Sequence, residues 1–186
     1  MGPSAFTVRA ATPADVPSLM RLKLLLAEGE NAVHAVRASA AEWLRDGFGP
    51  NPGFVAYVAE MTEQAASAQK MPAIVGMATC CRRIITGWGG PVIFLQDLYV
   101  EQEYRQHGIA RALVARVAAL AHEIGSPIVE LTVLAENAAA RNFYQNAGFA
   151  PLPQCLTYVL AGPALEALAA QSKDAAAELG TLALVG

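Results

Sequence analysis

The chain has 186 residues, of which 54% are hydrophobic and 16% charged, and its formal net charge is −3. This length and apolar content can bury one sizeable core and exclude an intrinsically disordered chain. The acidic balance, with a pI near 5.6, also excludes a globally basic nucleic-acid binder.

The sequence shows no sign of a membrane or secreted protein. No apolar run approaches the roughly 20 residues that a spanning helix needs, and the N-terminal region lacks the apolar stretch of a secretory signal. Cys80, Cys81 and Cys155 fit neither a disulfide framework nor a metal site. The adjacent pair lies in an apolar run, so we expect small core or strand residues, with a vicinal disulfide as the alternative. We therefore expect a reducing, cytoplasmic location and no metal.

A strand over 6–9 is predicted to lead into the first helix. Thr12 can cap this helix, Pro at the next position suits its first turn, and Asp15 reaches back to the free amides. The pattern ends near 28–30. The expected apolar face consists of Val16, Leu19, Met20 and Leu24.

A second capping box, Ser39 with Glu42, predicts a short helix that stops at Gly47. A polar loop at 62–70 separates the first two of the strands that follow, and Gly76 is a possible bulge. The predicted strands lie at 54–60, 72–81 and 92–100.

The second half of the chain contains the strongest helix signal, over 108–124. Its predicted apolar stripe is Ala110, Leu113, Val114, Val117, Leu120, Ala121 and Ile124. A strand at 127–134, a helix at 137–146, a strand at 156–160 and a helix at 163–179 follow. This order predicts three antiparallel strands before a parallel β-α-β unit, hence an α+β fold whose mixed sheet carries helices on both faces. We expect one domain over 1–162 and a helical extension over 163–186.

The turn between the strand at 92–100 and the long helix predicts an anion site. A helix start has four amides without internal partners and a partial positive charge, so a phosphate is a natural occupant. Gly108 and the small Ala110 allow close backbone approach, while Arg105 and Arg111 add positive charge. An ordinary glycine-containing helix start is the alternative.

The following helix carries a second motif, from Asn137 to Tyr144. Asn137 is a good helix cap, and Gly148-Phe149 closes the helix. Both helix starts then lie at the carboxyl ends of neighbouring parallel strands, where open α/β sheets bind ligands.

Together these motifs resemble the GCN5-related N-acetyltransferase (GNAT) superfamily, the acetyl-CoA-dependent amine acetyltransferases. The match to the family pattern Gln/Arg-x-x-Gly-x-Gly/Ala is Arg105-Gln106-His107-Gly108-Ile109-Ala110, and Asn137-x-x-Ala140-x-x-Phe143-Tyr144 follows in the right order. Residues 43–49 and 94–100 are similar to the diamine (spermidine/spermine) and thialysine acetyltransferases. The resemblance implies the GNAT-type acyl-CoA N-acyltransferase fold, with a central sheet of six to seven strands.

The resemblance also implies roles for individual residues. Backbone groups of Leu98 and Val100 would bind the pantetheine arm where a bulge splays the fourth and fifth strands, and Tyr144 would protonate the departing thiolate. A phenol with an ordinary pKa near 10 suits a thiolate whose acid has a pKa near 8.5. The implied acetyl-CoA contacts are Leu98, Tyr99, Val100, Arg105, Gln106, His107, Gly108, Ile109, Ala110, Arg111, Asn137 and Phe143.

The sequence does not assign the general base to one residue. Gln96 stands where diamine acetyltransferases carry a glutamate, and an amide cannot take the proton. Strand alternation puts Asp97 on the opposite face unless a bulge reorients it, and Glu136 is a further candidate. A water relay or an amine that arrives deprotonated would also serve. A purely structural Asp97, or a non-catalytic acyl-CoA-binding module, is the alternative.

We predict transfer of acetyl from acetyl-CoA to a primary amine by direct attack in a ternary complex. Glu28 and Glu30 could attract an amine, and Arg82 with Arg83 could hold a carboxylate, which together suggest a polyamine or an amino-acid-like amine. Solvated surface charges are the alternative for each pair. A homodimer is expected from the resemblance and from the apolar residues 182–185, which could equally form a frayed tail.

Overall fold

A computed structural model describes residues 5–62 and 74–170 of the chain. The chain divides into two compact units, Met1–Arg141 and Asn142–Gly186, and each is described here by itself. Nearly all of the predicted loop at 62–70, the part of the last predicted helix beyond 170, and the apolar residues 182–185 lie outside the described residues.

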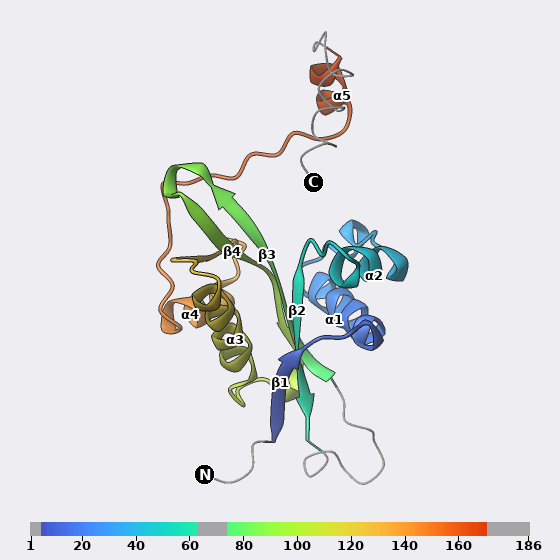
Figure 1. The fold of residues 1–186 in the computed structure, drawn as a ribbon, viewed down its shortest axis with the longest axis vertical. Coiled ribbons are helices and arrows are strands. Elements are labelled where there is room, and N and C mark those ends of the chain that lie inside the picture. Colours follow the sequence, from blue (N-terminus) through green and yellow to red (C-terminus); the bar gives the residue numbers. More distant parts are fainter. Residues whose placement is uncertain (1–4, 63–73, 171–186) are drawn as a thin grey trace. The chain divides into compact units, whose positions relative to one another are not determined.

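The first unit is built on a mixed sheet with the strand order β1-β2-β3-β4-β5 (Figure 1). Its strands are β1 (Phe6–Ala10), β2 (Val55–Met61), β3 (Ile74–Ile85), β4 (Gly90–Val100) and β5 (Val129–Leu131). The first three pairings are antiparallel and β4 pairs with β5 in parallel, which confirms the predicted mixed topology.

The described residues form five strands, so the expectation of six to seven is not met. The predicted strand at 156–160 is irregular, although its β-branched and aromatic residues Thr157, Tyr158 and Val159 favour a strand. The reason is that a strand is stable only when it is paired with a neighbour, and no pairing with this segment forms among the described residues. The strand predicted at 127–134 is also shorter, since β5 contains only three residues.

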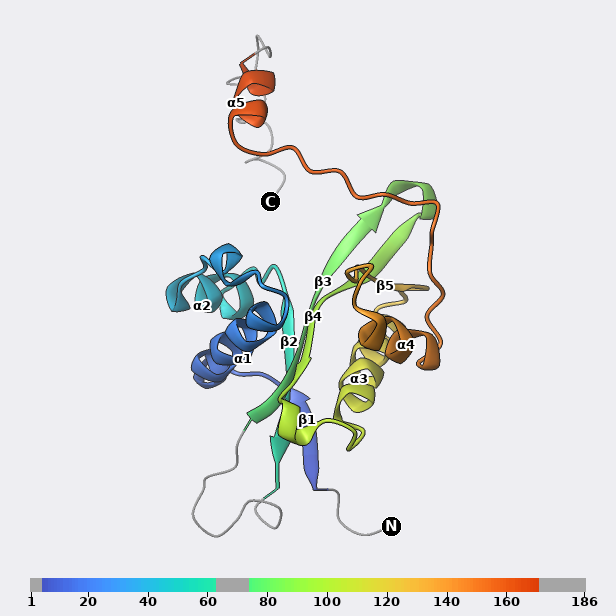
Figure 2. The same cartoon turned by 180° about the vertical axis from the view of Figure 1, so that it is seen from behind.

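Helices cover both faces of this sheet. The described α-helices are α1 (Val16–Gly29), α2 (Ala40–Phe48), α3 (Ile109–Glu123), α4 (Ala138–Asn146), which crosses the boundary between the units, and α5 (Pro163–Ala169), which belongs to the second unit. Figures 1 and 2 show α1 and α2 on one face of the sheet and α3 on the other. No helix in the described part of the chain is long and apolar enough to cross a membrane.

Both predicted capping boxes form. The Thr12–Asp15 box opens a short 3-10 turn that runs directly into α1, and the Ser39–Glu42 box opens α2. However, α2 continues to Phe48 rather than stopping at Gly47. Gly47 is needed for packing, because a Cβ there would lie 2.5 Å from the Phe54 ring.

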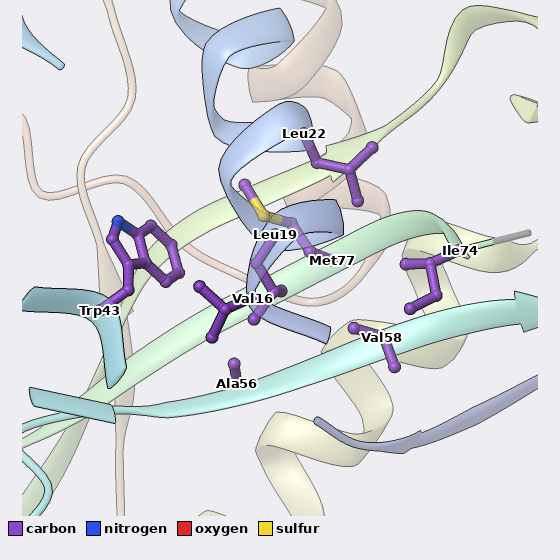
Figure 3. Close-up of a cluster of buried hydrophobic side chains, with 8 residues drawn as sticks. All are labelled: Val16, Leu19, Leu22, Trp43, Ala56, Val58, Ile74 and Met77. Atoms are coloured by element: carbon purple, nitrogen blue, oxygen red, sulfur yellow. The ribbon is translucent and has the colours of Figure 1, made fainter. Parts of the chain in front are cut away.

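A hydrophobic cluster joins α1 and α2 to the sheet (Figure 3). Its buried members are Val16, Leu19, Leu22, Trp43, Ala56, Val58, Ile74 and Met77. Leu22 thus takes the inward position that the sequence pattern assigned to Leu24, which is 41% exposed. The helix phase is set by Val16 and Leu19, and Leu22 continues their i, i+3 spacing.

The opposite face of the sheet is covered by α3. Its buried residues are Ile109, Leu113, Val114, Val117 and Ala121. Most of the predicted stripe is therefore confirmed, but Ile109 is buried and Ala110 is not, and Ile124 is 37% exposed. Ile109 reaches toward β3, where its side chain lies close to Gly76.

Cys80 is a core residue, as predicted from its apolar surroundings. It is fully buried in β3, and burial raises the pKa of its thiol to about 11. Cys81 is half-buried and Cys155 exposed, and all three are free thiols.

Candidate active site

A bulge in β4 places the two central candidates of the site. Thr79 pairs with Asp97, and the next β3 residue, Cys80, pairs with Leu95, so Gln96 is the extra residue of β4. Because of this bulge, Gln96 and Asp97 both line one cleft. The predicted alternative, a bulge that reorients Asp97, is therefore confirmed, and Asp97 does not follow the simple alternation.

The cleft has a volume of ≈ 250 Å³ and lies where α1, α2 and β4 meet. It is lined by Lys23, Ala38, Glu42, Trp43, Asp46, Phe54, Thr79, Gln96 and Asp97. Trp43 and Phe54 form an apolar wall, with their rings in edge-to-face contact at 5.3 Å. The other wall residues are mostly polar or charged, which suits a small polar ligand.

Asp97 is held by two neighbours. Its Oδ2 accepts a 2.6 Å hydrogen bond from the Thr79 hydroxyl, and its Oδ1 lies 2.5 Å from the Lys23 ammonium nitrogen. The Asp97 side chain is 12% exposed and that of Lys23 is 32% exposed. A carboxylate has about four lone-pair sites, so Asp97 retains acceptor capacity toward the cleft.

Two further carboxylates of the cleft come from α2, one helical turn apart. The Ser39 amide and hydroxyl donate to Glu42 and lower the pKa of its carboxyl, while Arg45 lowers the pKa of Asp46 through hydrogen bonds at 2.6 and 2.8 Å. Both side chains are consequently ionised at neutral pH. The cleft therefore presents three carboxylates and one ammonium group.

Beyond the bulge, no described strand pairs with β4 on the side of β5, and we call this segment of β4 the open edge. Its pairing with β5 ends at Leu95 and Leu131, while β4 itself runs on to Val100. The Glu101 amide donates to the Val75 carbonyl on β3, so by alternation the polar groups of Leu98 and Val100 point away from β3. This edge runs directly on from the cleft residues along the same strand.

The turn that follows β4 exposes the start of α3. Gly108 caps the helix in the left-handed conformation, with φ 82°, and Gln106 is also left-handed, with φ 66°. The first hydrogen bond of the helix is donated by the Ala112 amide to the Gly108 carbonyl. Within the described residues, the amides of 106–111 donate to no backbone carbonyl, and they can therefore serve as a concave anion site.

Basic side chains flank this turn. Arg111 is exposed, while the Nε of Arg105 donates to the Val100 carbonyl at 2.9 Å and its guanidinium lies 5.6 Å from the centre of the Tyr99 ring. The Nδ1 of His107 lies 2.7 Å from the Arg105 carbonyl oxygen. Arg105 thereby stabilises the turn that presents the free amides.

The chain matches the profile of the acetyltransferase (GNAT) family over residues 27–149, which include the cleft residues from α2 and β4, the open edge and the α3 start. It belongs to this family. GNAT enzymes use acetyl-CoA, and the chain is accordingly an acetyl-CoA-dependent N-acetyltransferase.

Individual relatives agree with this membership. The chain is 33% identical over 165 residues to the thialysine N-epsilon-acetyltransferase of Mus musculus, covering 87% of this chain and 96% of that protein. It is 34% identical over 143 residues to the spermidine/spermine N(1)-acetyltransferase-like protein 1 of Homo sapiens, covering 77% of this chain but only 20% of that protein.

A solved structure shares the fold. An aminoglycoside N-acetyltransferase in complex with CoA matches with a TM-score of 0.62 and 20% identity, covering 84% of this chain and 95% of that one. At this identity the likeness supports the GNAT fold alone.

The second GNAT motif spans the boundary between the two units. Asn137 caps α4, because its Oδ1 accepts the Ala140 amide at 3.0 Å. In the second unit, Tyr144 makes edge-to-face contacts with Phe143 at 5.3 Å and with Phe149 at 5.5 Å. The assignment of Tyr144 as acid and of Phe143 as a cofactor contact stays a prediction.

The predicted substrate residues lie outside the lining of the cleft. Glu28, Glu30 and Arg82 are exposed. Arg83 pairs with Glu130 at 3.0 Å and stacks on Phe94. Their proposed roles in substrate binding stay predictions. Glu136, the alternative base, is exposed in the turn between β5 and α4 and does not line the cleft either.

Sequence reasoning found Asp97 but missed the other charged residues that line the cleft, Lys23, Glu42 and Asp46. Glu42 was assigned only as a cap, and Asp46 only as part of a resembling segment. Lys23 carried no signal, since a lone lysine on an amphipathic helix ordinarily faces solvent. Only the packing of α1 beside β4 brings its ammonium group to Asp97.

Proposed function

We propose that this GNAT enzyme transfers acetyl to a primary amine of a small molecule that is cationic, such as a polyamine or an amino-acid-like amine, by direct attack in a ternary complex. One observation carries the proposal. The bulge at Gln96 brings an acidic cleft and an open strand edge together on β4. The amine and the acetyl donor would then meet along one strand.

Acetyl-CoA supplies the activated acetyl group as a thioester. The free amides around Gly108, with Arg105 and Arg111, suit its pyrophosphate, and the outward backbone groups of Leu98 and Val100 suit the amides of its pantetheine arm. Gly108 carries the fit of the phosphate to this turn, because it is left-handed and has no side chain. No atom lies within 4 Å of the place where a Cβ would be, so that space is open to a ligand. An outward β4 amide would also polarise the carbonyl that the amine attacks.

In this proposal Asp97 receives the proton of the bound ammonium group. Its carboxylate lines the cleft and has lone pairs left after accepting from Thr79 and Lys23. Gln96, one residue before it, is exposed at the bulge and orients the amine by hydrogen bonding, since an amide has no basic atom to take a proton. Tyr144 returns a proton to the departing thiolate.

A cytoplasmic homodimer completes the proposal. The free thiols support a reducing compartment. The second copy is proposed from the resemblance to the acetyltransferase (GNAT) family. Light scattering in solution tests the dimer, and a monomer at all concentrations contradicts it.

The binding site is tested by a matched pair of glycine variants at the two ends of α3. Gly108 and Gly125 are both left-handed, with φ 82° and 70°, and both are open where a side chain would extend. Gly108→Glu places a carboxylate at the phosphate site, so we expect acetyl-CoA binding, measured by calorimetry, to weaken at least about a hundredfold. Gly125→Glu imposes the same backbone strain and should bind normally.

Release of free CoA thiol with a panel of polyamines, lysine analogues and peptide N-termini tests the activity itself. Turnover of a small cationic amine, slowed in Tyr144→Phe, supports the proposal. Equal acetyl-CoA binding by the two glycine variants contradicts the site. Binding of acetyl-CoA without turnover of any amine contradicts the substrate class.

A further inference from the structure

Lys23 is a cleft residue for which the proposed chemistry has no role. Among the described residues that line the cleft, it supplies the positive charge, while Glu42, Asp46 and Asp97 supply three negative ones. A cation in a cleft that receives a cationic substrate repels part of that substrate, so it influences which substrates bind. Its presence therefore bears on specificity.

The geometry leaves Lys23 able to contact a ligand. An ammonium group has three donors, and that of Lys23 donates to Asp97 Oδ1 at 2.5 Å. The side chain is 32% exposed, so it is accessible from the cleft rather than sealed in the core. The ion pair with Asp97 holds the ammonium group in place, which lowers the entropy cost of a further contact.

The charges of the cleft are also separated by element. The positive charge comes from α1, and Glu42 and Asp46 both come from α2. A lining of both signs complements a molecule that itself carries both signs, such as an amino acid with an ammonium and a carboxylate group. A polyamine has positive charges alone and is repelled by Lys23.

We infer that Lys23 is a specificity-determining residue that favours amines bearing a carboxylate over polyamines of equal length. The inference rests on the proposed function for the location of the amine, and it names the substrate class more narrowly. Lys23 donates to the substrate carboxylate with the N–H groups that Asp97 leaves free. Repulsion of a second substrate ammonium group acts in the same direction.

L-lysine and cadaverine provide the test, because they differ only by the α-carboxylate. The measured quantity is the ratio of their kcat/KM values. In Lys23→Met we expect this ratio to fall about tenfold relative to the wild type, the usual size of one charged hydrogen bond. Lys23→Arg keeps the charge and should keep most of the preference.

Arg21→Met is the matched control. It removes a positive charge from the same helix, and its side chain pairs with Glu101 outside the cleft. The lysine-to-cadaverine ratio should be unchanged in this variant. A Lys23→Met enzyme that changes both kcat/KM values by the same factor overturns the inference, because Lys23 then acts only through Asp97.

Calorimetry with CoA present gives a readout that does not depend on turnover. L-lysine should bind the wild type more tightly than cadaverine does, and Lys23→Met should remove most of that difference. If neither amine is acetylated but this binding pattern holds, the proposed function fails while the role of Lys23 stands. If neither amine binds, or both bind equally well, the inference about Lys23 is overturned.

Discussion

Asp15 and Asp97 are two nearly buried carboxylates with cationic partners, and they differ in how fully they are satisfied. Asp15 is 9% exposed and accepts four hydrogen bonds, two from Arg9 and two from the amide and hydroxyl of Thr12. Asp97 is 12% exposed and accepts from Lys23 and Thr79 while lining a cleft. The two carboxylates are buried to a similar extent. They differ in how many further hydrogen bonds they can accept and in whether a ligand in the cleft can reach them.

The two sites therefore serve different purposes. Arg9 also donates to Glu60 at 2.8 Å, so the Asp15 cluster ties β1 and β2 to the turn that opens α1. Hydrogen bonding from Arg9 lowers the pKa of Asp15 to about 2. In turn, the hydrogen bonds to Asp15 and to Glu60 raise the pKa of the Arg9 guanidinium above its ordinary value. A saturated carboxylate stabilises the fold, whereas an unsaturated one in a cleft is available for substrate.

The largest expected effect is that of Asp97→Asn on turnover. The amide keeps the shape of the side chain but cannot take the ammonium proton, so kcat/KM should fall about 10²- to 10⁴-fold. The measurement is thiol release at saturating acetyl-CoA. A variant that loses stability as much as Asp15→Asn does, yet turns over normally per folded molecule, would identify Asp97 as structural.

The next effect is that of Asp15→Asn on stability. The lowered pKa of Asp15 corresponds to about 2 kcal/mol of folding free energy at neutral pH. The neutral amide of the variant lacks this contribution, so its free energy of unfolding should be lower by about that amount. Urea unfolding at pH 7 measures this loss. Activity per folded molecule should stay at the wild-type level, and a comparable loss of kcat/KM would erase the distinction between the two carboxylates.

The smallest effect is the acid dependence of that same stability. The folded-state pKa of Asp15, about 2, lies below its ordinary value of 3.8, so its contribution is complete above about pH 5 and is lost as the pH falls toward 2. The difference in unfolding free energy between wild type and Asp15→Asn should shrink over this interval. A difference that stays constant down to pH 2 contradicts the assigned cause.

The sequence by itself determined the local features of this protein. Both capping boxes, the helix after Gly108 and the Asn137 cap form as predicted, because each depends on hydrogen bonds or apolar spacing within a few residues. The two GNAT motifs are also local features that the sequence determines, because a helix start carries its own free amides and dipole.

Only the tertiary structure decided what the cleft contains. The bulge at Gln96 depends on the register between β3 and β4, and register is set by packing over the whole sheet rather than by neighbouring residues. That register brings Asp97 to the cleft, and the packing of α1 against the sheet brings Lys23 to Asp97. The irregular segment at 156–160 follows the same rule, because a strand forms only where a partner strand is available.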